Sequence, residues 1–211
     1  MAGHVTDNSS PARLTRKGVE SRARILDTAA RLFDEAGYHT TSMQDIVQAT
    51  GISKAGIYHY FTSKDEILVA IHNLLTDELI EHQAEHLATA QSATAILRSM
   101  VADMVEGMDQ HPAHFRVFNG VFTAELQRLS PESRDEVARK RRILHANFRR
   151  VIDLGVRNGE FEDPGERDLA VFGIVSMCWA YNRWPMPAGT TPSTAAETLF
   201  ELALRGLARR S

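Results

Sequence analysis

Residues 40–68 read TTSMQDIVQATGISKAGIYHYFTSKDEIL and carry three helix starts in close succession. Ser42, Ser53 and Ser63 each precede a helix-forming run, and serine is a favoured residue at a helix N-cap. Gly51 permits a tight turn between the first two runs, which are both short. Two short helices joined by a glycine turn predict a helix-turn-helix. The predicted helices cover 43–50 and 54–60, and a long third helix begins at 64.

Upstream of this segment, the apolar residues follow a helical period up to Gly37, which supplies a stop. The stripe consists of Ile25, Ala29, Leu32, Phe33 and Ala36. It predicts a helix from residue 20 that packs on the two short helices, so that residues 20–66 form a three-helix DNA-binding domain. Residues 1–19 are polar and are predicted to form a flexible basic arm, which carries Arg13, Arg16 and Lys17.

The composition is that of an ordinary globular chain and excludes several classes of protein. The 211 residues are 43% hydrophobic and 24% charged. No apolar run is long enough to cross a membrane, and the start has no apolar signal-peptide core, so we expect a cytoplasmic protein without a membrane partner. The single cysteine, Cys178, excludes an internal disulfide and fits a reducing compartment. The net charge of −3 gives no hint of nucleic acid, although its distribution is a basic head on an acidic body.

The rest of the chain is predicted to be helical throughout, with breaks at prolines and glycines. No stretch alternates with the period of a strand, so the predicted fold class is all-α. Residues 67–211 are expected to form a second helical domain. The expected helices cover 64–89, 92–109, 114–128, 132–157, 166–184 and 193–209.

The second short helix presents small, cationic and phenolic side chains outward, which suit entry into a major groove. These residues are Lys54, Gly56, Tyr58 and His59. Its first turn directs free backbone N–H groups toward a phosphate. Lys64 opens the following helix, where a cation is unfavourable to the helix dipole, and this favours a phosphate contact.

Residues 24–68 as a whole resemble the DNA-binding domain of the TetR family of transcriptional repressors. The matching features are the GYHTTS step, the GISK turn, the YHYF end and the SKDEIL helix start, in this order. The resemblance implies that the DNA-contacting positions are Thr41, Ser42, Ser53, Lys54, Gly56, Tyr58, His59 and Lys64. Three simpler alternatives stay open: Thr41 only caps its helix, Tyr58 belongs to the core, and His59 is an idle surface group.

The same resemblance implies a body that binds a small effector and forms a homodimer on a palindromic operator. The helices 166–184 and 193–209 would pair with their two-fold mates in a four-helix interface. Their apolar residues exceed what one monomer needs for its own core. These residues are Leu169, Phe172, Val175 and Met177 on the first helix, and Leu199, Leu202, Leu204 and Leu207 on the second.

Stripes of methionine and phenylalanine, followed by a helix end that reads CWAYNRW, predict an apolar effector pocket with one cation. The alternative is that each stripe is plain helix core. The candidate effector-binding residues are Met104, Met108, Phe118, Phe122, Trp179, Arg183 and Trp184. Residues 140–163 and 179–207 also resemble a TetR branch that controls fatty-acid and sterol breakdown and senses acyl-CoA thioesters. This resemblance implies an acyl-CoA or related lipid as the effector.

A competing metal-site motif is present at His82, Glu85 and His86, which match the H-x-x-E-H pattern of zinc peptidases. Two imidazoles four residues apart share a helix face, but a third ligand is needed, and His111 or His114 is the only suggestion that the sequence offers. The alternative function is therefore a metal-dependent sensor or hydrolase. Nucleophile-elbow, phosphate-loop and dinucleotide motifs are absent. The sequence predicts a regulator that is not an enzyme, with no cofactor, catalytic group or bound metal assigned.

Overall fold

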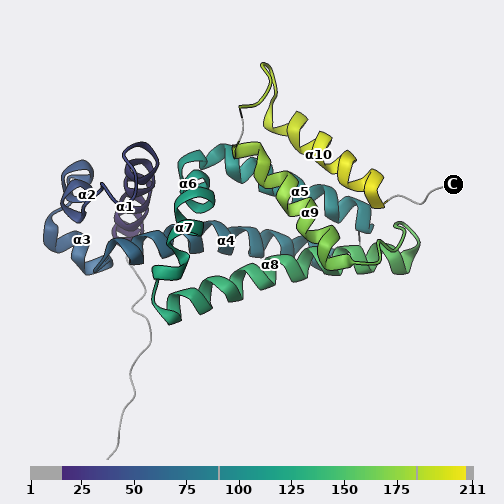
Figure 1. Ribbon diagram of the computed structural model, residues 1–211, viewed down its shortest axis with the longest axis horizontal. Helices are drawn as coiled ribbons and strands as arrows, with labels where there is room; N and C mark the ends of the chain where they lie inside the picture. Colours follow the sequence, from purple (N-terminus) through teal and green to yellow (C-terminus); the bar gives the residue numbers. More distant parts are fainter. Residues whose placement is uncertain (1–15, 90, 184, 208–211) are drawn as a thin grey trace, which may run out of the picture.

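The computed structural model describes residues 16–89, 91–183 and 185–207. Within these ranges the chain is all-α, as predicted, and no strand is present. Two layers of long helices form the body, and the short helices α2 and α3 lie at the opposite end of the molecule from α10 (Figure 1). The elements are α1 (Arg16–Glu35), α2 (Met43–Thr50), α3 (Lys54–Tyr60), α4 (Lys64–Ala88), α5 (Ala93–Gln110), α6 (Pro112–Val117), a π-helical turn (Phe118–Phe122), α7 (Thr123–Glu125), a 3-10 turn (Leu126–Arg128), α8 (Pro131–Asn158), α9 (Arg167–Arg183) and α10 (Pro192–Leu207).

Side-chain caps fix the starts of the three helices that follow α1. Ser42 Oγ accepts a hydrogen bond from Asp45 N at 3.2 Å, and the Asp45 carboxylate accepts one from Ser42 N at 2.7 Å. This reciprocal capping box satisfies backbone donors that a helix start would otherwise leave open. Ser53 and Ser63 each cap a helix through the side-chain oxygen alone, which accepts a hydrogen bond from the amide of Gly56 or Glu66. The predicted caps are therefore confirmed.

The head has its own apolar core, in which α1, α2, α3 and the start of α4 meet. Ile25, Phe33, Ile46 and Ile57 are completely or almost completely buried there. Gly51 ends α2 with a φ of +66°, a left-handed conformation that glycine adopts without steric cost. The angle between α2 and α3 is thus set by one turn and one small core.

The first helix starts at Arg16, earlier than the predicted start at residue 20. Arg16 and Glu20 form an ion pair one turn apart, with Nε and Oε1 separated by 3.1 Å, and Gly18 is buried. In the sequence, charged residues on the solvent face of a helix resemble those of a flexible polar arm. This resemblance explains why the predicted start of the helix is four residues too late. The remainder of the predicted arm, including Arg13, lies outside the described residues.

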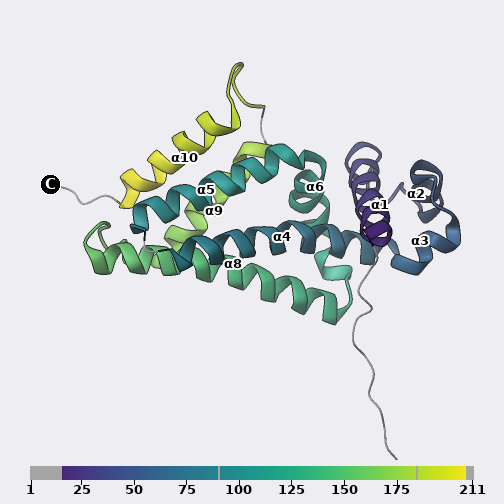
Figure 2. The ribbon, with the colours of Figure 1, turned by 180° about the vertical axis from the view of Figure 1, so that it is seen from behind.

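The body is built around α4 and α8, which run alongside each other in both views, with α5 and α9 on the other side of the core (Figures 1 and 2). The methionine stripe packs into that core, because Met100, Met104 and Met108 are all buried. α10 packs on α5. The predicted helix at 114–128 is interrupted: α6 begins at Pro112, and a π-helical turn at Phe118–Phe122 follows it. Gly120 weakens helix formation at this point, and π turns are common at functional sites.

Candidate DNA-binding surface and ligand cavity

α3 exposes three of the predicted DNA-contacting side chains, those of Lys54, Tyr58 and His59. The Lys54 ammonium lies 5.8 Å from the centroid of the Tyr58 ring, so the two side chains share one patch. A cation, a phenol and an imidazole on an exposed helix at the end of the molecule supply hydrogen-bond donors suited to phosphates and base edges. Two of the predicted DNA-contacting residues, Lys54 and Tyr58, thus lie together, and the core alternative for Tyr58 does not hold.

Thr41 lies inside the head, with 3% of its surface exposed. Its hydroxyl donates a hydrogen bond to the carbonyl oxygen of Gly37 at 2.8 Å and approaches that of Leu32 at 3.3 Å. These carbonyls belong to the end of α1 and its turn. The side chain therefore ties the end of α1 to the start of α2, and the predicted DNA contact does not use an exposed Thr41 hydroxyl.

Lys64 is anchored to the head at the start of α4. Its ammonium donates a hydrogen bond to the Tyr38 carbonyl oxygen at 2.7 Å and lies 4.5 Å from the centroid of the Tyr38 ring. Tyr38 in turn donates its hydroxyl proton to Asp65, and burial raises the pKa of that phenol. An ammonium has three donors, so this anchoring leaves donors for a phosphate contact. The hydrogen bond to Tyr38 also accounts for a lysine at this position without any phosphate contact.

Gly56 has an intramolecular reason for being a glycine. A Cβ atom at this position would lie 2.9 Å from Ile52 Cγ2 and 3.1 Å from Ser53 Oγ. The first of these distances is too short for two carbon atoms, so a larger residue would push α3 away from the turn. The small side chain expected for approach to a base also permits the close packing of the helix-turn-helix.

A cavity of about 700 Å³ lies within the body, between α4, α5, α8, α9 and the π-helical turn. Its apolar wall includes Phe118 and Trp179, whose rings stack with centroids 4.7 Å apart. Such a volume is typical of sites for small organic ligands. The lining residues are Leu79, Gln83, Met104, Phe118, Asn119, Arg141, Arg142, Leu144, His145, Ala146, Phe148, Arg149, Asp168, Val171, Phe172, Val175, Ser176 and Trp179.

The cavity contains three of the predicted effector residues, Met104, Phe118 and Trp179. Met108 is buried in the core but does not line the cavity. Arg183 is exposed at the end of α9 and does not line the cavity. The side chain of Phe122 and all of Trp184 lie outside the described part of the chain. The cation expected from Arg183 is thus not at this cavity.

The cationic groups at the cavity come from α8 instead, where Arg141, Arg142, His145 and Arg149 line one side. Arg142 and Arg149 are exposed, and Arg149 pairs with Asp168 at 2.6 Å. The Arg141 guanidinium lies 5.3 Å from the Phe118 ring centroid, and burial lowers its pKa. Burial and the neighbouring Arg141 also lower the pKa of His145. The cavity is therefore apolar within and positively charged along α8.

The sequence carries a signal for these cations that is easily mistaken for an ordinary surface pattern. In KRRILHANFRR, the basic residues Arg142, His145 and Arg149 recur at helical spacing beside Leu144 and Phe148. Such a pattern normally indicates a solvated helix face next to a core face. Only the packing of α9 along α8 turns the border between the two faces into a cavity wall.

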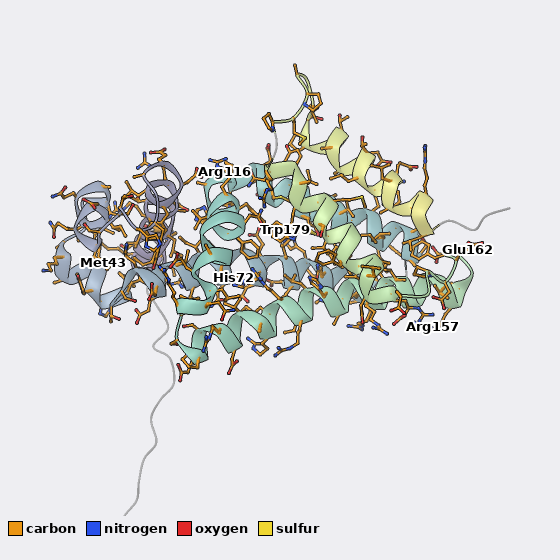
Figure 3. All side chains as sticks on the ribbon, viewed as in Figure 1. Met43, His72, Arg116, Arg157, Glu162 and Trp179 are labelled. Atoms are coloured by element: carbon orange, nitrogen blue, oxygen red, sulfur yellow. The ribbon has the colours of Figure 1, made fainter. Side chains whose placement is uncertain are left out.

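Two polar contacts join the head to the body across α1 and α6. Arg116 forms two parallel hydrogen bonds with Asp34, and His114 Nε2 lies 3.2 Å from Asp27 Oδ1. α6 leads directly into the π-helical turn, and Phe118 at its end also stacks on His72 of α4, with centroids 4.9 Å apart. Figure 3 labels Arg116, His72 and Trp179, which mark this path from the head contact to the cavity.

The alternative metal motif is not assembled into a metal site. His86 Nε2 lies 2.7 Å from Asp103 Oδ2, and His82 Nδ1 lies 3.7 Å from the same oxygen, whereas Glu85 is exposed. The suggested third ligands belong elsewhere, because His114 faces Asp27 at the head contact and His111 lies beside it. The described residues hold no group of three or more side chains placed to bind a metal ion. None of the described helices is long and apolar enough to cross a membrane.

A helix-turn-helix head joined to a helical body with its own ligand-sized cavity defines a DNA-binding transcriptional regulator. Residues 25–71 match the family model described as bacterial regulatory proteins, tetR family, and residues 90–207 match that of the tetracyclin repressor-like C-terminal domain. The chain belongs to the TetR family, and it is a TetR-type transcriptional repressor.

Individual relatives extend the similarity over almost the whole chain. The transcriptional repressor KstR2 of Rhodococcus jostii is 30% identical over 192 residues, which cover 89% of this chain and 91% of that protein. The TetR family regulator PfmR of Thermus thermophilus superposes with a TM-score of 0.77 at 34% identity, covering 88% of this chain and all of that one. AibR, solved with isovaleryl coenzyme A and operator DNA, shares the fold with a TM-score of 0.68 at 23% identity, covering 86% and 97%.

Proposed function

We propose that the protein is a homodimeric repressor that binds a palindromic operator through α3 and leaves it when an amphiphilic effector fills the cavity. The effector class that we propose is acyl-CoA or a related lipid. We place the protein in the cytoplasm and assign it no enzymatic activity. The observation that carries the proposal is one cavity in which an apolar interior meets the basic side chains of α8.

The lining residues suit the two halves of a thioester separately. Aromatic and aliphatic side chains such as Phe118, Phe148 and Trp179 suit an acyl chain or a fused ring, since burial of apolar surface is favourable by about 25 cal/mol per Å². Arg142 and Arg149 suit phosphate groups, to which guanidinium binds in bidentate geometry. The isovaleryl coenzyme A bound to AibR is consistent with this class of ligand.

Exposed apolar side chains on the last two helices support the homodimer. Leu169 and Phe172 of α9 are 66% and 60% exposed, and Leu202 of α10 is 53% exposed. Large apolar side chains exposed on a folded chain are a frequent mark of an interface. Val175 and Leu207, which were expected to contribute, are buried in the monomer. The proposed dimer surface is therefore narrower than the sequence pattern indicates.

A two-fold dimer would place two copies of α3 in successive major grooves, about 34–36 Å apart. An effector that moves the heads out of this spacing releases the operator. Moving a two-state dimer from about 1:99 to 99:1 requires an affinity difference between the states of roughly 5.5 kcal/mol. Burial of an acyl chain supplies such a difference when the cavity accepts the chain in only one of the two states.

The proposal is tested first by capture and sequencing of genomic fragments with the purified protein at two salt concentrations. A short palindrome whose enrichment falls sharply with salt is the expected result. The palindrome, made as a fluorescent duplex, is then titrated with butyryl-, octanoyl- and dodecanoyl-CoA, with free CoA and dodecanoate as controls. Release by a thioester but by neither control supports the effector class. If no thioester releases the protein from the palindrome, this effector class is rejected and the operator assignment still stands.

A further inference from the structure

The apolar wall of the cavity contains one deeply buried amide, that of Gln83 on α4. Its side chain lines the cavity although only 2% of the residue surface is exposed. Its neighbours along the wall include Leu79, Met104 and Phe148, which offer no hydrogen bonds. A polar group in such surroundings is costly unless it is hydrogen-bonded.

One partner in the structure contacts this amide. Asn147 of α8, 8% exposed, donates a hydrogen bond from Nδ2 to Gln83 Oε1 at 3.1 Å. The carbonyl end of Gln83 is thereby satisfied within the protein. The amide nitrogen still carries two donors, and no side chain or carbonyl in the described chain accepts from it.

We propose that Gln83 recognises an oxygen atom on the buried, apolar part of the effector. The amide nitrogen donates a hydrogen bond to a carbonyl or hydroxyl oxygen there, so that the effector is an oxygenated acyl or ring compound rather than a plain hydrocarbon chain. The inference rests on the proposed function and narrows its ligand class. A bound effector would then supply the acceptor that the apolar wall lacks.

The oxygen in question is separate from the anionic end of the effector. Arg142 and Arg149 are exposed, whereas Gln83 and its partner Asn147 are buried between α8 and α4. A ligand whose phosphates meet the exposed arginines thus turns its apolar portion toward the amide. Gln83 is accordingly a specificity-determining residue, and the arginines serve the part of the ligand that all thioesters share.

The test measures dissociation constants of dodecanoyl-CoA and of a series of dodecanoyl-CoA analogues, each with one hydroxyl group at a different chain position. Wild-type protein is expected to bind at least one hydroxylated analogue about tenfold more tightly than the parent, which is the size of one net hydrogen bond. The variant Q83L is expected to lose this preference while it binds the parent thioester at least as well.

A double variant and a matched control complete the experiment. Q83L/N147L removes both partners of the buried pair, so no donor stays unsatisfied if the single variant folds poorly. Q127L removes an exposed amide from the 3-10 turn, outside the cavity lining, and is expected to keep the preference. Circular dichroism checks that each variant is folded.

The possible outcomes separate the inference about Gln83 from the proposed effector class. If the wild type binds dodecanoyl-CoA but no hydroxylated analogue more tightly, the inference about Gln83 is wrong and the effector class stands. The inference is equally wrong if the preference persists in Q83L and the double variant. If no thioester binds the wild type, the proposed effector class itself fails, and the inference fails with it.

Discussion

Arg116 of α6 holds Asp34 of α1 in a two-bonded ion pair, with Nε at 3.0 Å from Oδ1 and Nη2 at 2.7 Å from Oδ2. The pair joins the DNA-binding head to the body. The same helix leads into the π-helical turn, where Phe118 lines the cavity. We therefore expect a shift of Phe118 on ligand entry to reach the head through this short helix and its contact with α1.

The variant R116A is expected to keep operator affinity and to weaken the response to effector. Without the ion pair, the head follows the body less closely, so half-release of the operator needs about fivefold more thioester, which is at the low end of typical coupling energies. R116K retains the charge but cannot form two parallel hydrogen bonds, and an intermediate shift is expected. The measurement is a dodecanoyl-CoA titration of the operator complex, followed by fluorescence anisotropy.

A control for R116A is R139A, which removes an ion pair with Glu136 on the exposed face of α8. Exposed pairs contribute only about 0–1 kcal/mol to stability, so neither variant is expected to unfold the protein. An unchanged half-release concentration in R116A would show that this contact does not transmit the effector signal.

Replacement of Lys54 by alanine is expected to weaken binding to all DNA sequences alike. Lys54 lies exposed on α3 beside Tyr58, where its ammonium suits a phosphate rather than a base. Loss of one phosphate contact should reduce the slope of log K against log salt by about one. The control variant is R205A, which removes one positive charge from α10, at the far end of the molecule from α3 (Figure 1). Equal slopes for K54A and the wild type would remove Lys54 from the phosphate contacts.

Arg142 is expected to matter for the effector and not for the operator. Its guanidinium is exposed at the cavity and is placed to meet an anionic group. R142A should raise the dissociation constant of dodecanoyl-CoA about fivefold, because it removes a charge-assisted hydrogen bond that solvent exposure weakens. R183A serves as the control, since Arg183 does not line the cavity. A larger loss of affinity in R183A than in R142A would return the anion site to the end of α9.

The comparison of Arg183 with Arg142 illustrates what the sequence predicts and what it does not. Caps and turns depend on a few neighbouring residues, so Ser42 and Gly51 identify the helix-turn-helix from local chemistry alone. A cavity depends instead on which helix faces fail to meet. The aromatic run around Trp179 indicates an apolar pocket, but the cation that borders the pocket comes from another helix. This cation, Arg142, lies 41 residues before Arg183 in the sequence.

Tertiary packing also determines two features that the sequence does not predict, the interruption of the helix at 114–128 and the burial of Gln83. Helical periodicity predicts that residues near Phe118 are helical, but the π-helical turn arises where the chain must bring Phe118 between His72 and Trp179. Gln83 is unremarkable in the sequence, because a glutamine on a long helix is normally exposed. Its burial against Asn147 follows only from the packing of α4 on α8.

The buried imidazole of His72 predicts a pH dependence of stability. Burial lowers its pKa to about 4, against 6.5 for an exposed histidine. Between these values the unfolded chain binds a proton that the folded chain does not, so stability rises with pH in this window. The contribution is complete above pH 6.5 and is lost as the pH falls toward 4, and it amounts to about 3 kcal/mol.

The variant H72F keeps an aromatic ring against Phe118 and removes the titration. Its stability, measured by urea unfolding, should therefore fall less steeply between pH 6.5 and pH 4 than that of the wild type. H59F, at an exposed imidazole, is the control, and parallel curves for H72F and the wild type would show that His72 is not held neutral in the fold.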